Sequence, residues 1–363
     1  MKKLSVYIHI PFCKSKCAYC DFVSFKCNQD MVKSYIKALC NEIESFDGRG
    51  YIVDSIFIGG GTPTYLDLQD FKSIIDCIKS NFTLNLCEFT IEGNPNSYTK
   101  EKVEFYKSQG VTRLSVGVQS LNDSVLKGIG RIHTARQAQN CLKMLVDSGL
   151  DINCDMMVGL PYQNLSIVKE DFEYIVKSGV SSVSCYSLIL EEETPLFDAV
   201  DSGKVSLPSQ DQTVDMYDIA KEILEKAGLN RYEISNFGKP CLHNIGYWTL
   251  KEYIGFGLSA HSFIGNTRFC NTSDLKKYLD GQDKITEEVL SAEDMRKEYA
   301  MLSLRMDNGI NVSDYIDKFG VDGYQKLLKE IDNDKSFYDI SDKAIAIKSE
   351  FIYISNSLIA NLI

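Results

Sequence analysis

The chain has 363 residues, 44% of them hydrophobic and 25% charged, an ordinary globular composition that allows one large domain and a smaller one. The formal net charge is −11 and no segment forms a basic stripe, which argues against a nucleic-acid-binding protein. No apolar run approaches the ~18 residues of a membrane-spanning helix. The first apolar run is interrupted by His9 and Pro11, unlike a signal peptide, so we expect a cytoplasmic protein.

Short β-branched runs alternate with helical patterns from Ser5 to about Leu190. Most of these runs are continuously apolar, as expected for strands of a parallel sheet that helices cover. They predict six strands, at Ser5–Ile10, Asp54–Ile58, Glu88–Glu92, Arg113–Val118, Ile152–Val158 and Ser182–Leu190.

Two of the intervening helices carry signals at both ends. Each begins with a hydroxyl residue followed three positions later by glutamine, which is the pattern of a capping box, and a glycine should end each helix. The pairs are Thr134–Gln137 and Ser209–Gln212, and the glycines are Gly149 and Gly228.

Six successive strand–helix units predict an α/β fold, a partial (β/α)6 TIM-like barrel, over residues 1–228. A flat, doubly wound sheet is the structural alternative. Residues 229–286 do not continue the alternation of strands and helices and are rich in aromatic residues, glycine and asparagine, so we interpret them as a connecting segment. Residues 287–363 predict a small C-terminal α+β domain, with helical patterns and a β-like end at Ala292–Met306, Val312–Phe319, Gly323–Ile331 and Ala344–Ile354.

Three of the twelve cysteines lie in one loop, CKSKCAYC, which follows the first predicted strand. Each loop residue advances the chain by only ~3.5 Å, so Cys13, Cys17 and Cys20 can surround one compact soft-metal centre. A four-iron cluster usually takes four cysteines, and three leave one iron open for an amino acid that chelates through its amine and carboxylate. The alternatives are a zinc knuckle, for which His9 and Cys27 are poor fourth ligands, and a plain loop. The nine scattered cysteines are expected to be small core residues.

Unusual residues stand at the end of each predicted strand, and barrel sites lie at the carboxyl ends of the strands. The second strand is followed by GGGTPT, which lacks the lysine of a phosphate-binding P-loop. Its glycines let backbone groups approach a ligand closely, or form a plain tight turn. Glu92 and Asp155 are carboxylates on otherwise apolar strands, where an unpaired buried charge is costly. The agreement of six strand ends predicts a ligand site at this end of the barrel.

The segment YIHIPFCKSKCAYC resembles the start of radical-SAM superfamily proteins, specifically oxygen-independent coproporphyrinogen III dehydrogenases and the related HemW-type haem chaperones. The similarity runs almost from end to end. It implies a [4Fe–4S] cluster on Cys13, Cys17 and Cys20, with S-adenosylmethionine (SAM) bound at the cluster. The associated chemistry is one-electron reduction of the sulfonium, which releases methionine and a 5′-deoxyadenosyl radical.

The resemblance also implies which residues contact SAM. Tyr7 is expected to approach the bound SAM and Tyr19 to pack beside its adenine, although without the resemblance both would be interpreted as core residues. Hydrogen-bonding side chains suit the ribose hydroxyls and the methionyl carboxylate. The other expected SAM-binding residues are Gly60, Gly61, Thr62, Glu92, Gln119, Arg131, Asp155 and Ser187.

Two features separate the two branches. The dehydrogenase branch has a fourth cysteine two residues after the third, where this chain has Phe22. The chaperone branch has an HNxxYW motif that accompanies haem binding, and this chain reads HNIGYW from His243, with its only tryptophan. His243 is therefore the first candidate haem ligand and His261 the second, while a structural hydrogen-bond hub is the alternative for His243. The remaining histidines, His9 and His133, are interpreted as structural.

The sequence thus predicts a haem chaperone that carries a [4Fe–4S] cluster and SAM, binds haem and transfers it to an acceptor protein. The alternatives are a radical-SAM enzyme, such as coproporphyrinogen III dehydrogenase, acting on a porphyrin-like substrate, and a zinc-stabilised scaffold without SAM. The expected partners are haem, a haem-accepting protein and an electron donor such as flavodoxin or ferredoxin. No nucleic acid is expected, and membrane contact is expected only through the acceptor.

Overall fold

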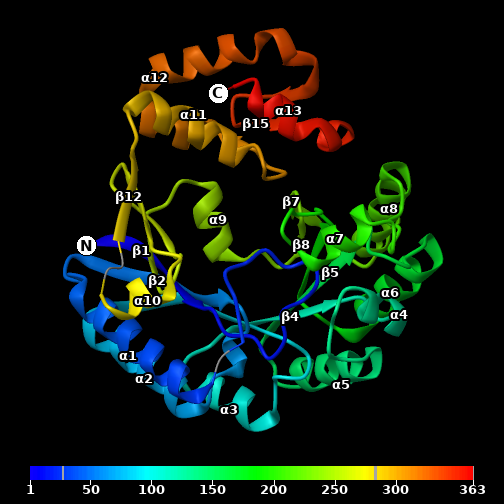
Figure 1. The fold of residues 1–363 in the computed structure, drawn as a ribbon. Helices are drawn as coiled ribbons and strands as arrows, with labels where there is room; N and C mark the ends of the chain where they lie inside the picture. Colours follow the sequence, from blue (N-terminus) through cyan, green and yellow to red (C-terminus); the bar gives the residue numbers. More distant parts are fainter. Residues whose placement is uncertain (27, 282–283, 363) are drawn as a thin grey trace.

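The computed structural model describes residues 1–26, 28–281 and 284–362. Its first part alternates strands and helices, as shown in Figure 1. The strands are β1 (Lys2–Ile10), β2 (Tyr51–Gly60), β3 (Thr83–Gly93), β4 (Arg113–Gln119), β5 (Asp151–Val158) and β6 (Ser182–Ser187). The helices are α1 (Gln29–Ser45), α2 (Leu68–Asn81), α3 (Lys100–Ser108), α4 (Asp123–Gly128), α5 (Ala135–Val146), α6 (Leu165–Ser178), α7 (Pro195–Asp201) and α8 (Gln210–Lys226).

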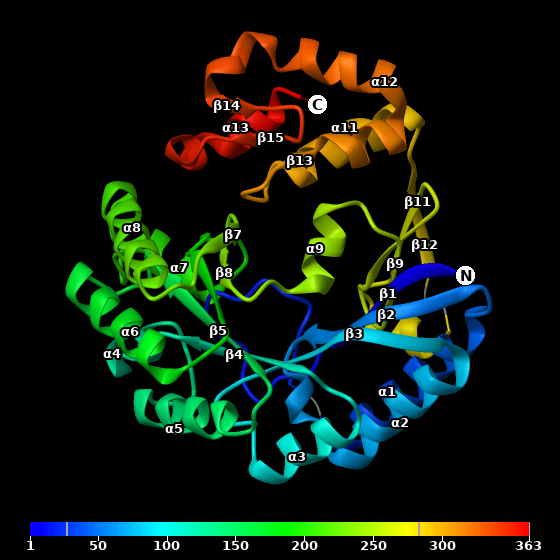
Figure 2. The same ribbon diagram turned by 180° about the vertical axis from the view of Figure 1, so that it is seen from behind.

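Strands β1 to β6 form a parallel sheet in chain order. Helices cover its outer face, and the sheet curves around the interior (Figures 1 and 2). A doubly wound sheet would reverse its strand order and carry helices on both faces, so that alternative is wrong. The outer strands β1 and β6 pair with β9 (Tyr253–Phe256) and β8 (Asn236–Gly238) respectively, which makes the barrel partial, as predicted.

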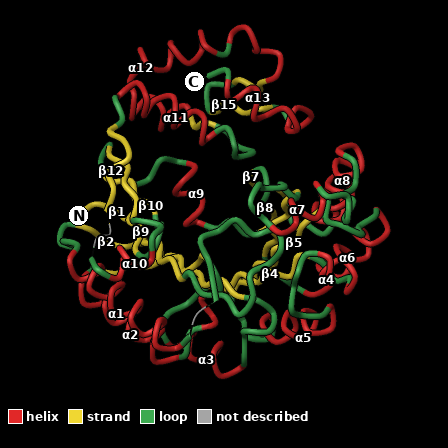
Figure 3. Tube along the Cα trace, viewed as in Figure 1, coloured by secondary structure: helices red, strands yellow, loops and turns green. Residues whose placement is uncertain are grey.

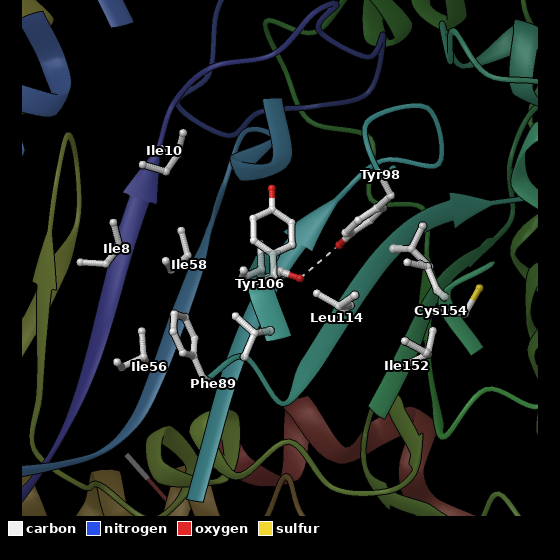
Figure 4. Close-up of a cluster of buried hydrophobic side chains, with 14 of the residues drawn as sticks. Ile8, Ile10, Ile56, Ile58, Phe89, Tyr98, Tyr106, Leu114, Ile152 and Cys154 are labelled. Atoms are coloured by element: carbon white, nitrogen blue, oxygen red, sulfur yellow. Dashed lines mark hydrogen bonds between the residues drawn. The ribbon is translucent and has the colours of Figure 1, made fainter. Parts of the chain in front are cut away.

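The apolar core lies between the sheet and the outer helices. Side chains from successive strands, among them Ile8, Ile56, Phe89, Leu114 and Ile152, are buried in one continuous layer (Figure 4). Because side chains alternate along a strand, the neighbouring residues of the same strands face the barrel interior. These inward positions carry the polar residues of the candidate site.

Both predicted capping boxes are confirmed, at the starts of α5 and α8, and Gly149 and Gly228 follow these helices with positive φ. Two predicted strands were too long. Strand β6 ends at Ser187, and only the first residues of the β-like C-terminal run form β15 (Ala344–Ile347), after which a 3₁₀ helix (Ser349–Ile354) begins. In both places the apolar run continues past the strand into a loop or a 3₁₀ helix. Hydrophobicity alone does not distinguish such a segment from a strand.

Residues after α8 extend the sheet at both edges and place one helix inside it (Figures 1 and 3). Helix α9 (Leu242–Trp248) lies on the inner side of the sheet and contacts β2 and β3. The elements here are β7 (Arg231–Glu233), β8, α9, β9, β10 (His261–Ile264), β11 (Thr267–Asn271), α10 (Leu275–Leu279) and β12 (Lys284–Val289).

The C-terminal elements have their own hydrophobic core, built from residues 299–362. They lie over the inner face of the sheet, on the side away from the outer helices, and α11 contacts α9 (Figure 2). No helix in the described part of the chain is long and apolar enough to cross a membrane. The elements are α11 (Ala292–Ser303), β13 (Ile310–Asn311), α12 (Val312–Glu330, kinked at Gly320), β14 (Tyr338–Ile340), β15 and α13 (Ser355–Ala360), with 3₁₀ helices at Pro63–Tyr65, Asp332–Phe337 and Ser349–Ile354.

Candidate functional site

The cysteine loop is a closed loop at the carboxyl end of β1. Its two ends meet where Phe12 pairs with Phe25, and the Cys13 N–H donates to the Phe25 carbonyl at 3.1 Å. The middle of the loop is held at Ala18, whose N–H donates to the Ile129 carbonyl at 3.0 Å. The loop is therefore tied to the barrel at its base and at its tip, which holds its thiols in place.

A chain of hydrogen bonds links two of the cysteines through the ends of three strands. The Cys13 Sγ lies 3.4 Å from the Thr62 Oγ1, to which the Asn94 Nδ2 donates at 2.9 Å. The Asn94 Oδ1 accepts from the Arg131 Nη2 at 2.6 Å, and the Arg131 Nη1 donates to the Cys17 Sγ at 3.3 Å. Residues far apart in the sequence thus form one polar network at the predicted site.

The donor set of this network fits an anionic sulfur-ligated group. Half-buried Arg131 places a fixed positive charge against Cys17, and its buried Nε atom has no protein partner. Burial raises the pKa of the Cys20 thiol, so positive charge or metal is needed to hold it as a thiolate. The described residues contain no set of three Cys, His, Asp or Glu side chains converging on a single-ion site. In a four-iron cluster each thiolate binds its own iron, so such convergence is not required.

The glycine run lies against the cysteine loop, and two of its positions need glycine. Gly60 has a φ of +106°, and a Cβ there would lie 2.6 Å from the His9 ring. A Cβ at Gly61 would lie 2.8 Å from the Phe12 carbonyl oxygen, where the Gly61 N–H instead donates to the Ile10 carbonyl at 2.8 Å. The run therefore brings the backbone of β2 directly beside the base of the cysteine loop.

Glu92 and Asp155 face the barrel interior close enough for their charges to interact. The Glu92 Oε2 accepts from the Gly60 N–H at 3.1 Å, and Asp155 accepts from the Asn153 Nδ2 at 2.7 Å and from the Ser115 hydroxyl. Burial raises the pKa of Glu92 to about 7, and repulsion from Asp155 adds to this rise. Burial also raises the pKa of Asp155. Two half-buried carboxyl groups whose negative charges repel each other form a site that suits a positively charged ligand.

The other expected SAM contacts are distributed around this pair. Tyr7 faces the interior, with its hydroxyl 3.1 Å from the His9 Nδ1. Gln119 ends β4 with a φ of +68°, a strained backbone that turns its side chain back over the strand end. Tyr19 packs in a small separate apolar cluster, and Ser187 lies exposed at the end of β6. The SAM roles of these residues stay predictions.

A polar cavity of about 410 Å³ opens beside the hydrogen-bond chain. It collects positive charge in a chain whose net charge is −11. Its basic lining residues are Lys14, Lys102 and Arg131. Cys17, Thr62 and Asn94 of the hydrogen-bond chain also line it. This cavity suits an anionic or strongly polar ligand group next to the cysteines.

His243 has the geometry of the alternative interpretation, a structural hub. It is 1% exposed, its Nδ1 lies 3.0 Å from the Ser55 Oγ, and its Nε2 lies 2.9 Å from the Tyr247 hydroxyl. Burial lowers its pKa to about 3. Both ring nitrogens are occupied within the protein, so the geometry does not support the prediction that His243 ligates haem.

Helix α9 is attached to the barrel at its N-terminus as well. The buried Glu88 carboxylate accepts from the N–H groups of Leu242 and His243 at 2.9 and 3.1 Å and from the Cys241 Sγ at 3.1 Å. A carboxylate at a helix N-terminus satisfies orphan N–H groups and complements the helix dipole. With His243 bound to Ser55, the helix is anchored to two strands.

A second, larger cavity of about 630 Å³ adjoins α9. Its walls are largely aromatic and come from four parts of the chain. Tyr247 and Trp248 line it from α9, Phe22 from the cysteine loop, and Leu302 from α11. The remaining lining residues are Tyr7, His9, Asp21, Val23, Leu250, Lys251, Tyr253, Ser259, His261, Phe263 and Arg268.

Sequence analysis missed two residues that build the site. Asn94 is the centre of the cysteine-linking network, and Glu88 holds the helix that carries the HNxxYW motif. Asn94 follows Glu92 at the same strand end, a position that could have identified it. The four-residue spacing of His243 and Tyr247 indicates one helical face, a signal of α9 within the region that the sequence analysis interprets as a connecting segment. Cys27, which the sequence analysis considers as a fourth zinc ligand, lies outside the described residues.

Comparisons with known proteins agree with this geometry. The Radical SAM superfamily matches residues 7–175. The haem chaperone HemW of Lactococcus lactis subsp. lactis (strain IL1403) is 36% identical, covering 93% of this chain and 92% of the relative. The HemW of Bacillus subtilis (strain 168) is 35% identical, covering 90% of both chains. Coproporphyrinogen III oxidase (HemN) of Escherichia coli has the same fold, with a TM-score of 0.85 and 22% identity over 99% of this chain and 90% of that one.

Proposed function

This chain belongs to the HemW haem-chaperone family of the radical-SAM superfamily, and from that premise we propose that it binds haem and transfers it to an acceptor protein. The observation that carries the proposal is the position of α9. Tyr247 and Trp248, the last residues of the HNxxYW motif, line the 630 Å³ cavity, and Phe22 of the cysteine loop lines the same cavity. A cavity of this size with aromatic walls suits a flat, largely apolar macrocycle.

The proposal includes a [4Fe–4S] cluster on Cys13, Cys17 and Cys20 and SAM beside it. When bound, this pair supplies one-electron chemistry at the sulfonium. The chain itself supplies charge and orientation. Arg131 offsets the negative charge of the thiolates, and the Glu92–Asp155 pair offers carboxylates to the cationic end of SAM. The Gly60 N–H orients Glu92, so the glycine run and the carboxylates act together.

The dehydrogenase alternative is less well supported. Its fourth cysteine would stand at Phe22, whose ring is 64% exposed and lies at the aromatic cavity. An apolar ring at this point adds to a porphyrin-binding surface and supplies no thiolate. The relatives of this chain at 35–36% identity are named haem chaperones, whereas the likeness to HemN rests on fold.

The deciding experiment is an anaerobic reconstitution of the cluster followed by haem titration with and without SAM. We expect saturable haem binding with a shifted Soret band. Coproporphyrinogen III should not be converted under reducing conditions with SAM and an electron donor such as flavodoxin. Decarboxylation at catalytic rates, or haem binding that does not saturate, would contradict the chaperone function. Transfer is tested by mixing the haem-loaded protein with an apo-acceptor and following the acceptor's own Soret band.

A further inference from the structure

The aromatic cavity offers flat rings to a macrocycle. His243 clamps α9 to Ser55 and so sets Tyr247 and Trp248 at the cavity. The Arg305 guanidinium lies over the Trp248 ring, 4.8 Å from its centroid, and is not among the described residues that line the cavity. Aromatic rings bind the apolar body of any porphyrin, so selection among porphyrins has to come from the charged residues of the wall.

The positive charges of the wall are already paired with carboxylates. Among the described lining residues, the Asp, Glu, Lys and Arg side chains are Asp21, Lys251 and Arg268. The Lys251 Nζ donates to the Asp54 Oδ1 of β2, and the Arg268 Nη2 donates to the Glu298 Oε1 of α11. Exposed Asp21 adds a further negative charge. The wall therefore offers no surplus positive charge to an incoming carboxylate.

These ion pairs are shielded from water, which strengthens their effect. The side chains of Asp54 and Glu298 are only 13% and 11% exposed, so solvent screens their charges little. The Glu298 Oε2 is buried without a hydrogen-bond partner, and the Arg268 Nη1 lies 4.0 Å from a second carboxylate, that of Glu288. A ligand carboxylate placed here would be buried beside like charges, which is costly.

Porphyrins differ in where they carry their carboxylates. Haem has two propionates on neighbouring pyrrole rings, so both can stay in water at one edge while the opposite edge enters a cavity. Coproporphyrin III has a propionate on every pyrrole ring, so whichever edge enters brings carboxylates with it. A wall whose cations are all paired distinguishes these two patterns, because only the second forces carboxylates against it.

We infer that the aromatic cavity selects its porphyrin by charge. The pairs Lys251–Asp54 and Arg268–Glu298 admit a macrocycle with its carboxylates at one edge and reject one with a carboxylate on every ring. This inference rests on the proposed function and specifies the ligand class of its site. The propionate edge of the bound haem stays in water.

The test uses the cluster-reconstituted protein and metal-free porphyrins at about pH 8, where iron ligation plays no part and free imidazole groups are neutral. Binding is followed by quenching of Trp248, the only tryptophan of the chain. Protoporphyrin IX and deuteroporphyrin IX should bind roughly tenfold or more tightly than coproporphyrin III. Deuteroporphyrin IX has hydrogen in place of the vinyl groups, so it controls for their loss.

Variants that release one cation should relax the selection. Glu298→Gln and Asp54→Asn should each tighten coproporphyrin III binding by about three- to tenfold and change protoporphyrin IX binding by less than about twofold. Glu293→Gln is the matched control on α11, because Glu293 pairs with Arg296, which is not among the described lining residues. It should change neither affinity. Circular dichroism and cluster content check the folding of each variant.

Two results would overturn the inference while saturable haem binding leaves the proposed function standing. The first is wild-type protein that binds coproporphyrin III within about threefold of deuteroporphyrin IX, a comparison that needs no variant and so holds if one misfolds. The second is an unchanged preference in the folded Glu298→Gln and Asp54→Asn variants. Absence of saturable binding of haem and of all three porphyrins would overturn the proposed function itself.

Discussion

The two cavities of this protein are built in different ways. The polar cavity beside the cysteine loop depends on directed hydrogen bonds, in which Thr62, Asn94 and Arg131 each hold the next residue in a chain from Cys13 to Cys17. The aromatic cavity depends on the packing of whole elements: α9, hairpin β10–β11, the cysteine loop and α11. Directed bonds bind a charged group at one defined position, whereas packed rings provide area for a large flat ligand.

This difference implies different sensitivities to mutation. In the polar cavity a single substitution removes a charge or a thiolate that no neighbour replaces. In the aromatic cavity the contact area is shared by several rings, so most single changes should weaken binding without abolishing it. Both cavities take part of their lining from the cysteine loop, Lys14 and Cys17 for the polar cavity and Phe22 for the aromatic one. The following predictions, from the largest effect to the smallest, would break or sharpen this contrast.

The largest effect is expected at the cysteine loop. Cys13→Ala, Cys17→Ala or Cys20→Ala should each abolish the visible absorption and the iron of the reconstituted cluster, because two thiolates cannot hold it. Exposed Cys87→Ala is the control and should reconstitute normally. Metal-free protoporphyrin IX should still bind the three variants. Full iron content in Cys17→Ala, or its loss in Cys87→Ala, would refute the ligand set.

The carboxylates should affect SAM but not iron. Glu92→Ala and Asp155→Ala each remove charge-assisted interactions of about 1.5–3 kcal/mol, which corresponds to a roughly tenfold to hundredfold weaker SAM affinity by calorimetry. Asp171→Asn is the matched control, since Asp171 is also buried but bonds to Ser120 within the barrel wall. Unchanged SAM affinity in both site variants would place the SAM pocket elsewhere.

His243 should affect stability more than ligand chemistry. His243→Gln leaves the Ser55 or Tyr247 hydroxyl without its buried partner and should lower the free energy of unfolding by roughly 1–3 kcal/mol in urea titrations. Haem bound to the folded variant should keep the wild-type Soret position. The control His133→Gln disturbs a single bond to the Val118 carbonyl and should cost less. A variant as stable as wild type would mean that α9 does not depend on this clamp.

Per pH unit, the smallest effect is expected in the pH dependence of stability. The Glu92 pKa is about 7 in the folded chain against 4.5 for the free side chain, so the folded state binds this proton more tightly than the unfolded state. Glu92 therefore stabilises the fold below pH 4.5, and this contribution is lost as pH rises through 7, with a slope of at most about 1.4 kcal/mol per pH unit. Unfolding experiments from pH 5 to 8 without SAM should show a flatter profile for Glu92→Gln. Parallel profiles would show that Glu92 ionises normally.

Much of the fold could be predicted from the sequence because its signals are local. Apolar runs located six strands, capping residues and glycines located two helices, and the spacing of Cys13, Cys17 and Cys20 indicated a soft-metal loop. Strand ends became less certain where an apolar run continued into a loop, as after Ser187. These features depend on residues within a few positions of one another, so the sequence alone is enough to predict them.

Tertiary structure decided which side chains meet. Arg131 reaches Cys17 across 114 positions, and Glu88 caps the helix of His243 across 155. No local sequence pattern predicts such contacts, because each depends on how strands far apart in the sequence align in the barrel. The same holds for the two candidate haem ligands. The motif favoured His243, and only burial and hydrogen bonding show that this ring is enclosed while His261 stands at the cavity wall.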